Sequence, residues 1–271
     1  MNEISGKRAA AALAAIRGKK PLVHNITNYV VMNYTANALL ACGASPVMAH
    51  AAAEVQEMTA LAGALVLNIG TLSPAWIEAM HLAGERANQL GVPVILDPVG
   101  AGATRLRTET AKELLTRLKV SLVRGNASEI MALASGEGGT KGVDSIHGVE
   151  EAALVAPGLA RDLQTPVAIT GPQDLITDGK RTFMVGNGHP LMSRVTGMGC
   201  TATALTGAFL AVEPDPVDAA TWALSYLGLA GERAALSANG PGSFAVALLD
   251  ALYNLDAPAL AAGARVSQVL S

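Results

Sequence analysis

Residues 92–101, VPVILDPVGA, decide the fold, because a short apolar run is followed at once by an acidic residue and a glycine-containing turn. The apolar run over 92–96 predicts a buried β-strand, and residues 108–118 have the spacing of a helix. The same order recurs along the chain. Strands are expected over 22–24, 46–48, 64–68, 92–96, 121–123 and 167–170, and helices over 29–41, 74–90 and 108–118. This alternation predicts an α/β fold with a central, mostly parallel sheet and helices on both faces.

The pattern changes after residue 165. Asp178-Gly179 is a dipeptide typical of hairpin turns and lies between two short β-like runs. Strands are expected here over 174–177 and 181–185, and helices beyond them over 200–212, 216–238 and 242–254. The composition of residues 135–145 predicts a flexible loop. Because neither a linker nor a repeat is evident, we expect a single domain over residues 1–271.

The composition predicts a protein with much buried surface. Of 271 residues, 51% are hydrophobic and only 15% are charged, which is below the usual quarter. Residues 21–53 lack Asp, Glu, Lys and Arg, so this stretch either enters a membrane or is buried between subunits. Asn25, Asn28 and two prolines within it argue against a membrane span. Residues 1–20 predict an amphipathic helix rather than a signal peptide, so we expect a cytoplasmic protein.

Charge and cysteine content argue against further classes of protein. The net charge is −3 and no long basic run occurs, so a nucleic-acid partner is not expected. The two cysteines, Cys42 and Cys200, are far apart in the sequence and form no CxxC pair. Neither a disulfide framework nor a structural zinc site is therefore expected.

Polar or glycine-rich residues follow most of the predicted strands. In an open α/β sheet, ligands bind at the carboxyl ends of the strands. The polar stretches are residues 24–25, 68–71, 97–101, 124–126 and 170–172. We therefore expect the functional site where these stretches converge.

The strongest single motif is RVTGMGCT over residues 194–201, which leads directly into an apolar helical segment. Gly197 and Gly199 permit a tight turn and close approach to a ligand, and the following helix N-terminus favours an anion such as phosphate. A plain turn before a helix is the alternative, and the Gly-Lys-Ser/Thr of a Walker A loop is absent. Cys200 lies in the first helical turn, either as a thiol with a lowered pKa or as a small buried packing residue.

Four further polar residues each have a functional and a structural interpretation. Asp97 follows a strand and suits magnesium, or anchors its loop. Glu129 comes three residues after Asn126, so it completes a capping box or faces the metal and its waters. Arg124 clamps phosphate oxygens or is a solvated surface residue. Thr170 binds a nucleotide phosphate or caps a turn.

The order of these motifs resembles the hydroxyethylthiazole kinase family across residues 20–212. The matching motifs are HNITN (24–28), GASPVM (43–48), LNIGTL (67–72), LDPVGA (96–101), RGNASEI (124–130) and VTGMGC (195–200). The resemblance implies a ribokinase-like fold, with ATP as co-substrate and Mg²⁺ as the metal. It also implies a homotrimer with active sites between subunits, which would account for the uncharged residues 21–53.

The resemblance further implies which residues bind the two substrates. Met48 and Gly197 would contact the thiazole, with Asn25 close by. The residues that bind ATP would be Arg124, Thr170 and Asn126.

Metal binding and catalysis are implied in the same way. Asp97 and Glu129 would face Mg²⁺. The backbone amides from Gly197 through Gly199 to Cys200 would stabilise the transferring phosphoryl group. Cys200 would stand where sugar kinases of this superfamily carry an aspartate base.

The expected function is ATP-dependent phosphorylation of the hydroxyl of 4-methyl-5-(2-hydroxyethyl)thiazole in thiamine biosynthesis or salvage. A kinase for hydroxymethylpyrimidine or pyridoxal is one alternative. A dehydratase that repairs hydrated nicotinamide cofactors is a second, although its glycine loop ends in aspartate and Cys200 argues against it. A nucleotide sensor without turnover is a third. Met198 stands where the family more often has threonine, and we expect little effect on the anion hole.

Overall fold

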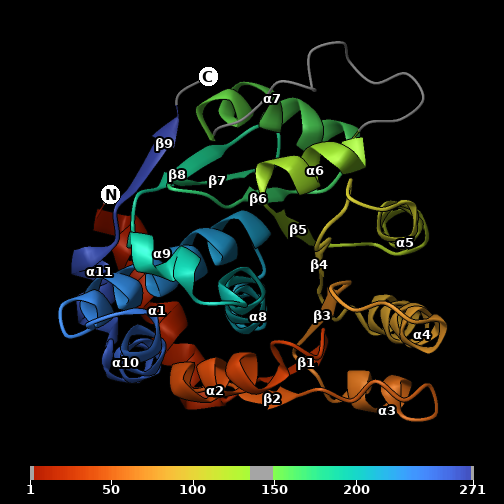
Figure 1. The fold of residues 1–271 in the computed structure, drawn as a ribbon, viewed down its shortest axis with the longest axis horizontal. Helices are drawn as coiled ribbons and strands as arrows, with labels where there is room; N and C mark the ends of the chain where they lie inside the picture. Colours follow the sequence, from red (N-terminus) through yellow and green to blue (C-terminus); the bar gives the residue numbers. More distant parts are fainter. Residues whose placement is uncertain (1–2, 135–148, 270–271) are drawn as a thin grey trace.

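Nine strands form one sheet, in the order β2-β1-β3-β4-β5-β6-β7-β8-β9 (Figure 1). The computed structural model describes residues 3–134 and 149–269, so the loop predicted over 135–145 lies outside the described residues. The strands are β1 (Leu22–Ile26), β2 (Ser45–Val47), β3 (Ala64–Asn68), β4 (Val94–Asp97), β5 (Leu122–Gly125), β6 (Val167–Ile169), β7 (Asp174–Thr177), β8 (Thr182–Val185) and β9 (Val266–Val269). Every predicted strand is present, with bounds that differ by two residues or fewer.

The direction of the strands places the polar stretches along one edge. Strands β1 to β6 pair in parallel, and Asn68 is in register with Asp97 at the ends of β3 and β4. Strands β6 to β9 then pair antiparallel. The predicted hairpin is confirmed, because the Asp178 N–H donates to the Arg181 carbonyl at 3.3 Å. Strand β9 was not predicted, since only its first residue is buried and its pattern carries little signal.

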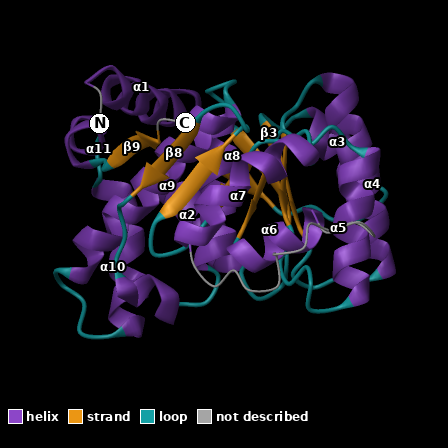
Figure 2. Ribbon diagram, turned by 90° about the horizontal axis from the view of Figure 1, so that it is seen from above, coloured by secondary structure: helices purple, strands orange, loops and turns teal. Residues whose placement is uncertain are grey.

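Helices cover both faces of the sheet and enclose two apolar cores (Figures 1 and 2). The first layer contains α1 (Glu3–Lys19), α2 (Met32–Cys42), α8 (Met198–Leu210), α9 (Pro216–Ala235), α10 (Pro241–Asn254) and α11 (Ala257–Gly263). The second contains α3 (Val55–Ala60), α4 (Pro74–Leu90), α5 (Arg105–Arg117), α6 (Ala127–Ala134) and α7 (Val149–Asp162). The predicted mostly parallel α/β fold with helices on both faces is confirmed.

Local signals explain where the predicted helices begin. The Ser73 hydroxyl accepts from the Trp76 N–H at the start of α4, and the Asp215 carboxylate accepts from two backbone N–H groups at the start of α9. Such side chains satisfy amides that have no partner inside the helix. Helices α3 and α11 were not predicted, because six and seven residues are too few for a clear helical period.

Helix α8 runs through the middle of the first layer and packs against β1, β3 and β4. Its residues from Thr201 to Leu210 are all buried, which explains why this segment lacks charge. Within the described ranges, no single helix is both long and apolar enough to span a membrane, and α10 with α11, bent by 110°, passes that test only as a pair. The packing of α8 fixes its N-terminus at the carboxyl edge of the sheet.

Arg17, in the last turn of α1, is expected to stabilise the junction with the end of α10. Its Nη2 atom donates to the carbonyls of Tyr253 and Leu255, both at 2.9 Å. Carbonyls at a helix C-terminus otherwise lack intrahelical donors. Arg17→Met should lower the free energy of unfolding by about 1–3 kcal/mol, as measured by urea denaturation.

The matched control for this prediction is Arg105→Met. The Arg105 side chain is 88% exposed and, among the residues that the structure describes, pairs only with Glu109 four residues on. Its loss should change the free energy of unfolding by less than about 0.5 kcal/mol. Equal effects of the two substitutions would show that the Arg17 contacts do not stabilise the fold.

Candidate active site

The site is built around Asp97, the last residue of β4, which is fully buried. Its Oδ2 atom accepts hydrogen bonds from Asn68 Nδ2 at 2.7 Å and Thr203 Oγ1 at 2.8 Å. Its Oδ1 atom has no hydrogen-bond partner among the described residues. Burial raises the pKa of Asp97 to about 6, although the positive charge of Arg124 opposes the shift. A buried acceptor with unused capacity is typical of a site that binds a cation or an ordered water.

Arg124 connects this carboxylate to the next strand and to α8. Its Nη1 atom lies 3.7 Å from Asp97 Oδ1, and its Nη2 atom donates to the Thr170 hydroxyl. A Cβ atom on Gly199 would lie 2.6 Å from Nη1, so the guanidinium rests against the helix backbone where only glycine fits. The Nε atom is buried without a hydrogen-bond partner among the described residues. A buried guanidinium with an unsatisfied donor is typical of a site that binds an anion.

The glycine loop holds the N-terminus of α8 in place. Gly197 caps the helix with φ +82°, and a Cβ atom there would lie 2.6 Å from Cγ1 of Val31. The Thr201 N–H bonds the Gly197 carbonyl at 2.8 Å, which closes the first turn. The amides of Met198, Gly199 and Cys200 belong to this turn and have no acceptor within the helix. A helix terminus of this kind favours an anion, as predicted from the sequence, and Arg124 lies against it.

Cys200 belongs to a chain of side-chain hydrogen bonds that leads to Asp97. Asn28 Nδ2 donates to the Cys200 sulfur at 3.4 Å and to Asn68 Oδ1 at 2.9 Å, and Asn68 bonds Asp97. Of the two interpretations of Cys200, the thiol with a lowered pKa is wrong. Burial and the neighbouring Asp97 raise the pKa of Cys200 to about 11, since both effects disfavour a second negative charge.

Cys200 should therefore react slowly with alkylating reagents. A pKa raised from 9.0 to about 11 leaves about 10²-fold less thiolate at neutral or mildly alkaline pH. The iodoacetamide rate of the Cys200 peptide, followed by mass spectrometry, should rise about tenfold per pH unit to about pH 10. A rate that levels off near pH 9, as for an ordinary thiol, would contradict the raised pKa.

The second predicted acidic residue, Glu129, lies at the start of α6. Its Oε2 atom accepts from the Asn126 N–H, and Asn126 Oδ1 accepts in return from the Glu129 N–H, both at 2.9 Å. This reciprocal pair is a capping box. Glu129 Oε1 also accepts from the Gly100 N–H at 2.9 Å, which joins α6 to the loop after Asp97. The negative charge of Glu129 reaches Asp97 and opposes its ionisation.

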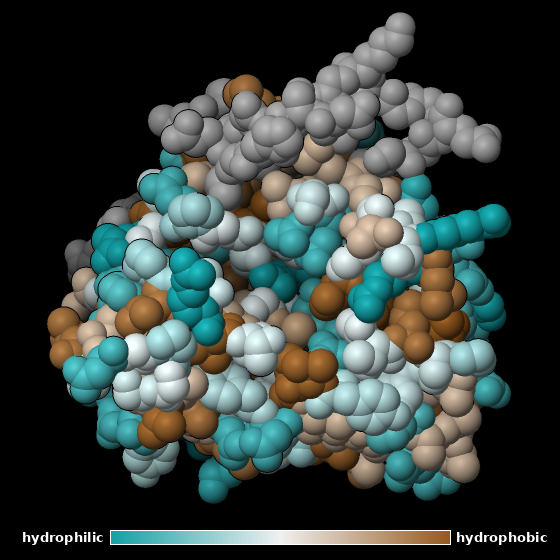
Figure 3. Space-filling view, viewed as in Figure 1, coloured by the Kyte–Doolittle hydropathy of each residue, from teal (hydrophilic) through white to brown (hydrophobic). Residues whose placement is uncertain are grey.

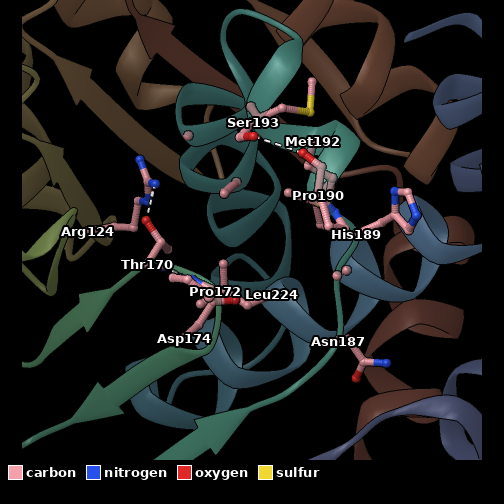
Figure 4. Close-up of a pocket in the computed structure, with 17 residues that line it drawn as sticks. Arg124, Thr170, Pro172, Asp174, Asn187, His189, Pro190, Met192, Ser193 and Leu224 are labelled. Atoms are coloured by element: carbon pink, nitrogen blue, oxygen red, sulfur yellow. Dashed lines mark hydrogen bonds between the residues drawn. The ribbon is translucent and has the colours of Figure 1, made fainter. Parts of the chain in front are cut away.

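A cavity of about 620 Å³ opens beside this network, in a face that is hollowed near its centre (Figures 3 and 4). Of the predicted residues, Arg124, Thr170 and Gly199 line it. Met48 and Asn25 do not line it, and Asn25 Nδ2 instead bonds the Val23 carbonyl at 3.1 Å. These two residues lie on or just after β1 and β2, at the far end of the sheet order.

Several residues that hold the site together were given no role from the sequence. Asn28 and Asn68 carry the hydrogen bonds between Cys200 and Asp97. Asn28 belongs to the uncharged residues 21–53 and Asn68 to the polar stretch 68–71, which are the signals that were available. Thr203 lies inside an apolar helical segment, and nothing in the pattern of that segment indicates its bond to Asp97. Arg107 on α5 donates to three backbone carbonyls of the loops after β3 and β4, at 2.7 to 3.2 Å.

The mostly parallel sheet with helices on both faces is a ribokinase-like fold. A solved structure from Enterococcus faecalis, described as a ribokinase-like superfamily protein, shares this fold with a TM-score of 0.65 at 11% identity, over 95% of this chain and 96% of that one. At that identity the likeness shows the fold alone.

The chain belongs to the hydroxyethylthiazole kinase family, whose family model matches residues 13–258. A relative from Desulfotalea psychrophila named hydroxyethylthiazole kinase is 60% identical over 96% of this chain and 95% of its own length. The solved structure of a hydroxyethylthiazole kinase protein from Pyrococcus horikoshii is 51% identical, covers 97% of this chain and all of that one, and has a TM-score of 0.90. The family resemblance found in the sequence is confirmed.

Proposed function

We propose that this protein is a phosphotransferase that moves the γ-phosphoryl group of ATP to the hydroxyl of 4-methyl-5-(2-hydroxyethyl)thiazole, in thiamine biosynthesis or salvage. Relatives that are more than half identical over nearly the whole chain bear the name hydroxyethylthiazole kinase. The observation that carries the proposal is the Arg124–Thr170 pair lying against the N-terminus of α8, beside a cavity large enough for a nucleotide.

In this mechanism the protein mainly positions the reactants and stabilises charge, as phosphoryl transfer requires. Arg124 and Thr170 hold the phosphates of ATP, with Asn126 nearby at the end of β5. The amides from Gly197 to Cys200 face the transferring group, and each such donor contributes about 10²–10³ in rate. The positive end of the α8 dipole favours the same negative charge.

The proposed thiazole site lies around Met48, Gly197 and Asn25. Tyr29 and Val30 follow β1 closely and are 65% and 66% exposed, which is unusual for large apolar side chains. A partner subunit covering them would enclose the thiazole, so we include in the proposal a homotrimer with active sites between subunits. A cytoplasmic location also stays a proposal.

Asp97 and Glu129 fit the magnesium ion that the family implies. Asp97 supplies a buried oxygen that has no hydrogen-bond partner in the described part of the chain. Both Glu129 oxygens already accept backbone N–H groups and keep further lone pairs for bound water. Mg²⁺ would neutralise charge on the phosphates when bound. The Nη1 atom of Arg124 lies 3.7 Å from Asp97 Oδ1, so its positive charge balances part of the negative charge of the carboxylate.

Cys200→Ala should slow turnover without abolishing it. The raised pKa keeps the thiol protonated at neutral pH, so Cys200 positions the alcohol by hydrogen bonding, and the alcohol proton passes to a phosphate oxygen late in the transfer. We expect kcat to fall about 10- to 100-fold, toward the low end of a general-base contribution, in a steady-state assay. Complete loss of activity in a folded variant would show that Cys200 is an essential base.

The alternative functions are not favoured by the comparisons, because relatives at more than 50% identity carry the hydroxyethylthiazole kinase name. Release of ADP from ATP and magnesium, with the thiazole alcohol, hydroxymethylpyrimidine or pyridoxal added in turn, tests the proposal. Release that depends on the thiazole alcohol supports it. Release only with another alcohol would contradict the substrate, and ATP binding without turnover would point to a sensor.

A further inference from the structure

We propose that Asp174 binds the ribose hydroxyls of the nucleotide and makes this site select ribonucleotides over deoxyribonucleotides. The inference rests on the proposed function, since it takes the cavity beside Arg124 as the nucleotide site. It adds to that function a residue that determines which nucleotide is used.

Asp174 is the first residue of β7 and lies on the wall of the cavity, partly exposed. Its Oδ1 atom accepts from the Gly171 N–H at 3.1 Å. No hydrogen bond to its other oxygen occurs among the described residues, and that oxygen is not sealed in the interior. The bond to Gly171 fixes the carboxyl group, while its second oxygen has free acceptor capacity.

The charge of Asp174 restricts what it can contact. Burial raises its pKa to about 6, opposed by the Gly171 N–H and by the charge of Arg124, so the group is mostly ionised at neutral pH. An ionised carboxylate only accepts hydrogen bonds, and it repels phosphate. A nucleotide offers such a group two kinds of donor, the hydroxyls of the ribose and the N–H groups of the base.

The position of Asp174 favours the ribose. Figure 4 shows Asp174 beside Pro172 and Leu224, on the side of the cavity where Arg124 and Thr170 lie. Away from Arg124, the cavity has apolar lining from Pro190 and Met192 of η2 (Pro190–Arg194) and from Leu227 of α9, which suits the flat face of a base. The polar side chains of Asn187, His189 and Ser193 also line the cavity. In a nucleotide, the ribose joins the phosphates to the base. A carboxylate close to the phosphate end therefore meets the ribose first.

The test compares the dissociation constants of ATP, 2′-deoxy-ATP and 3′-deoxy-ATP by calorimetry, for the full-length protein with magnesium. A site that hydrogen-bonds a substrate hydroxyl rejects an analogue that lacks the hydroxyl. The wild type should bind at least one deoxy analogue about tenfold or more weakly than ATP, as expected for a hydrogen bond to a charged group. In Asp174→Ala, ATP should weaken to the level of that analogue and the ratio should fall to about 1.

Asp174→Asn tests the charge with little change in shape. Asp250 is an exposed carboxylate on α10, and Asp250→Asn is the matched control that should keep the wild-type ratio of the deoxy-analogue and ATP dissociation constants. Equal binding of ATP and both deoxy analogues by the wild type would overturn this inference and leave the proposed function standing. The Asp174 variants could instead lose selectivity for ATP over GTP while the ratio between deoxy analogue and ATP stays unchanged. That result would show that Asp174 contacts the base, and it would also overturn the inference. Failure of the wild type to bind ATP at all would overturn the proposed function together with this inference.

Discussion

Arg124→Met should lower kcat/KM for ATP by about 10²–10³-fold, the range for losing a donor that stabilises a transferring phosphoryl group. Arg124 is 7% exposed and lies between Thr170, Asp97 and the backbone of Gly199. It presents a fixed positive charge where phosphate oxygens would bind, and methionine keeps the apolar stem of the side chain without the charge. The loss should appear mainly in the kinetic constants for ATP, with KM for the thiazole alcohol nearly unchanged.

Two further variants separate charge from packing at this position. Arg124→Lys retains the charge but not the planar fork, so an intermediate loss is expected. Arg233→Met, at an exposed position on α9, is the control and should leave the kinetics unchanged. If Arg124→Met raised KM for the thiazole alcohol and left ATP unaffected, Arg124 would belong to the other substrate.

Asp97→Asn should lower kcat by about 10²–10³-fold in saturating ATP and magnesium, as expected for one electrostatic group at a transition state. Asparagine fills nearly the same volume and can keep the bonds from Asn68 and Thr203 through its oxygen. Its amide group would then replace Oδ1, so a donor would face Arg124 where an acceptor faces it now. The variant loses both the charge and the acceptor on the side of the proposed metal.

The fold of Asp97→Asn should stay close to that of the wild type. An ionised carboxylate whose pKa is raised to about 6 by burial destabilises the folded state at neutral pH, and the neutral amide removes that cost. Melting curves and circular dichroism check this. Asp250→Asn serves as the control and should be fully active. More than about a tenth of wild-type kcat in Asp97→Asn would show that the carboxylate is not part of the catalytic machinery.

Most of the fold could be predicted because its signals are local. The strands β3 and β7 and the helix α4 were predicted with their observed bounds, since each is a clear periodic segment flanked by turn or capping residues. The strand β9 and the helix α11 are short and carry no such pattern. Their positions depend on contacts with β8 and α1, which are distant in the sequence.

The site was predictable in part, because several of its residues directly follow predicted strands. The rule that ligands bind after parallel strands brought Asp97, Arg124 and Thr170 together, and the structure joins them. The pKa of Cys200 could not be predicted, because it depends on burial and on Asp97, a residue 103 positions away in the sequence. The proposed thiazole residues Met48 and Asn25 lie outside the cavity, and Asn25 is buried and bonded to its own strand, so the cavity does not bring them together with Arg124.

Phosphorus NMR of the complete reaction tests the central claim most directly. Purified protein is mixed with ATP, magnesium and 4-methyl-5-(2-hydroxyethyl)thiazole, and all phosphorus-containing products are followed together. The account predicts one new phosphate monoester on the thiazole alcohol, formed in equal amount with ADP and without inorganic phosphate. ADP accompanied by inorganic phosphate, or no monoester while ATP is bound, would contradict transfer to the alcohol.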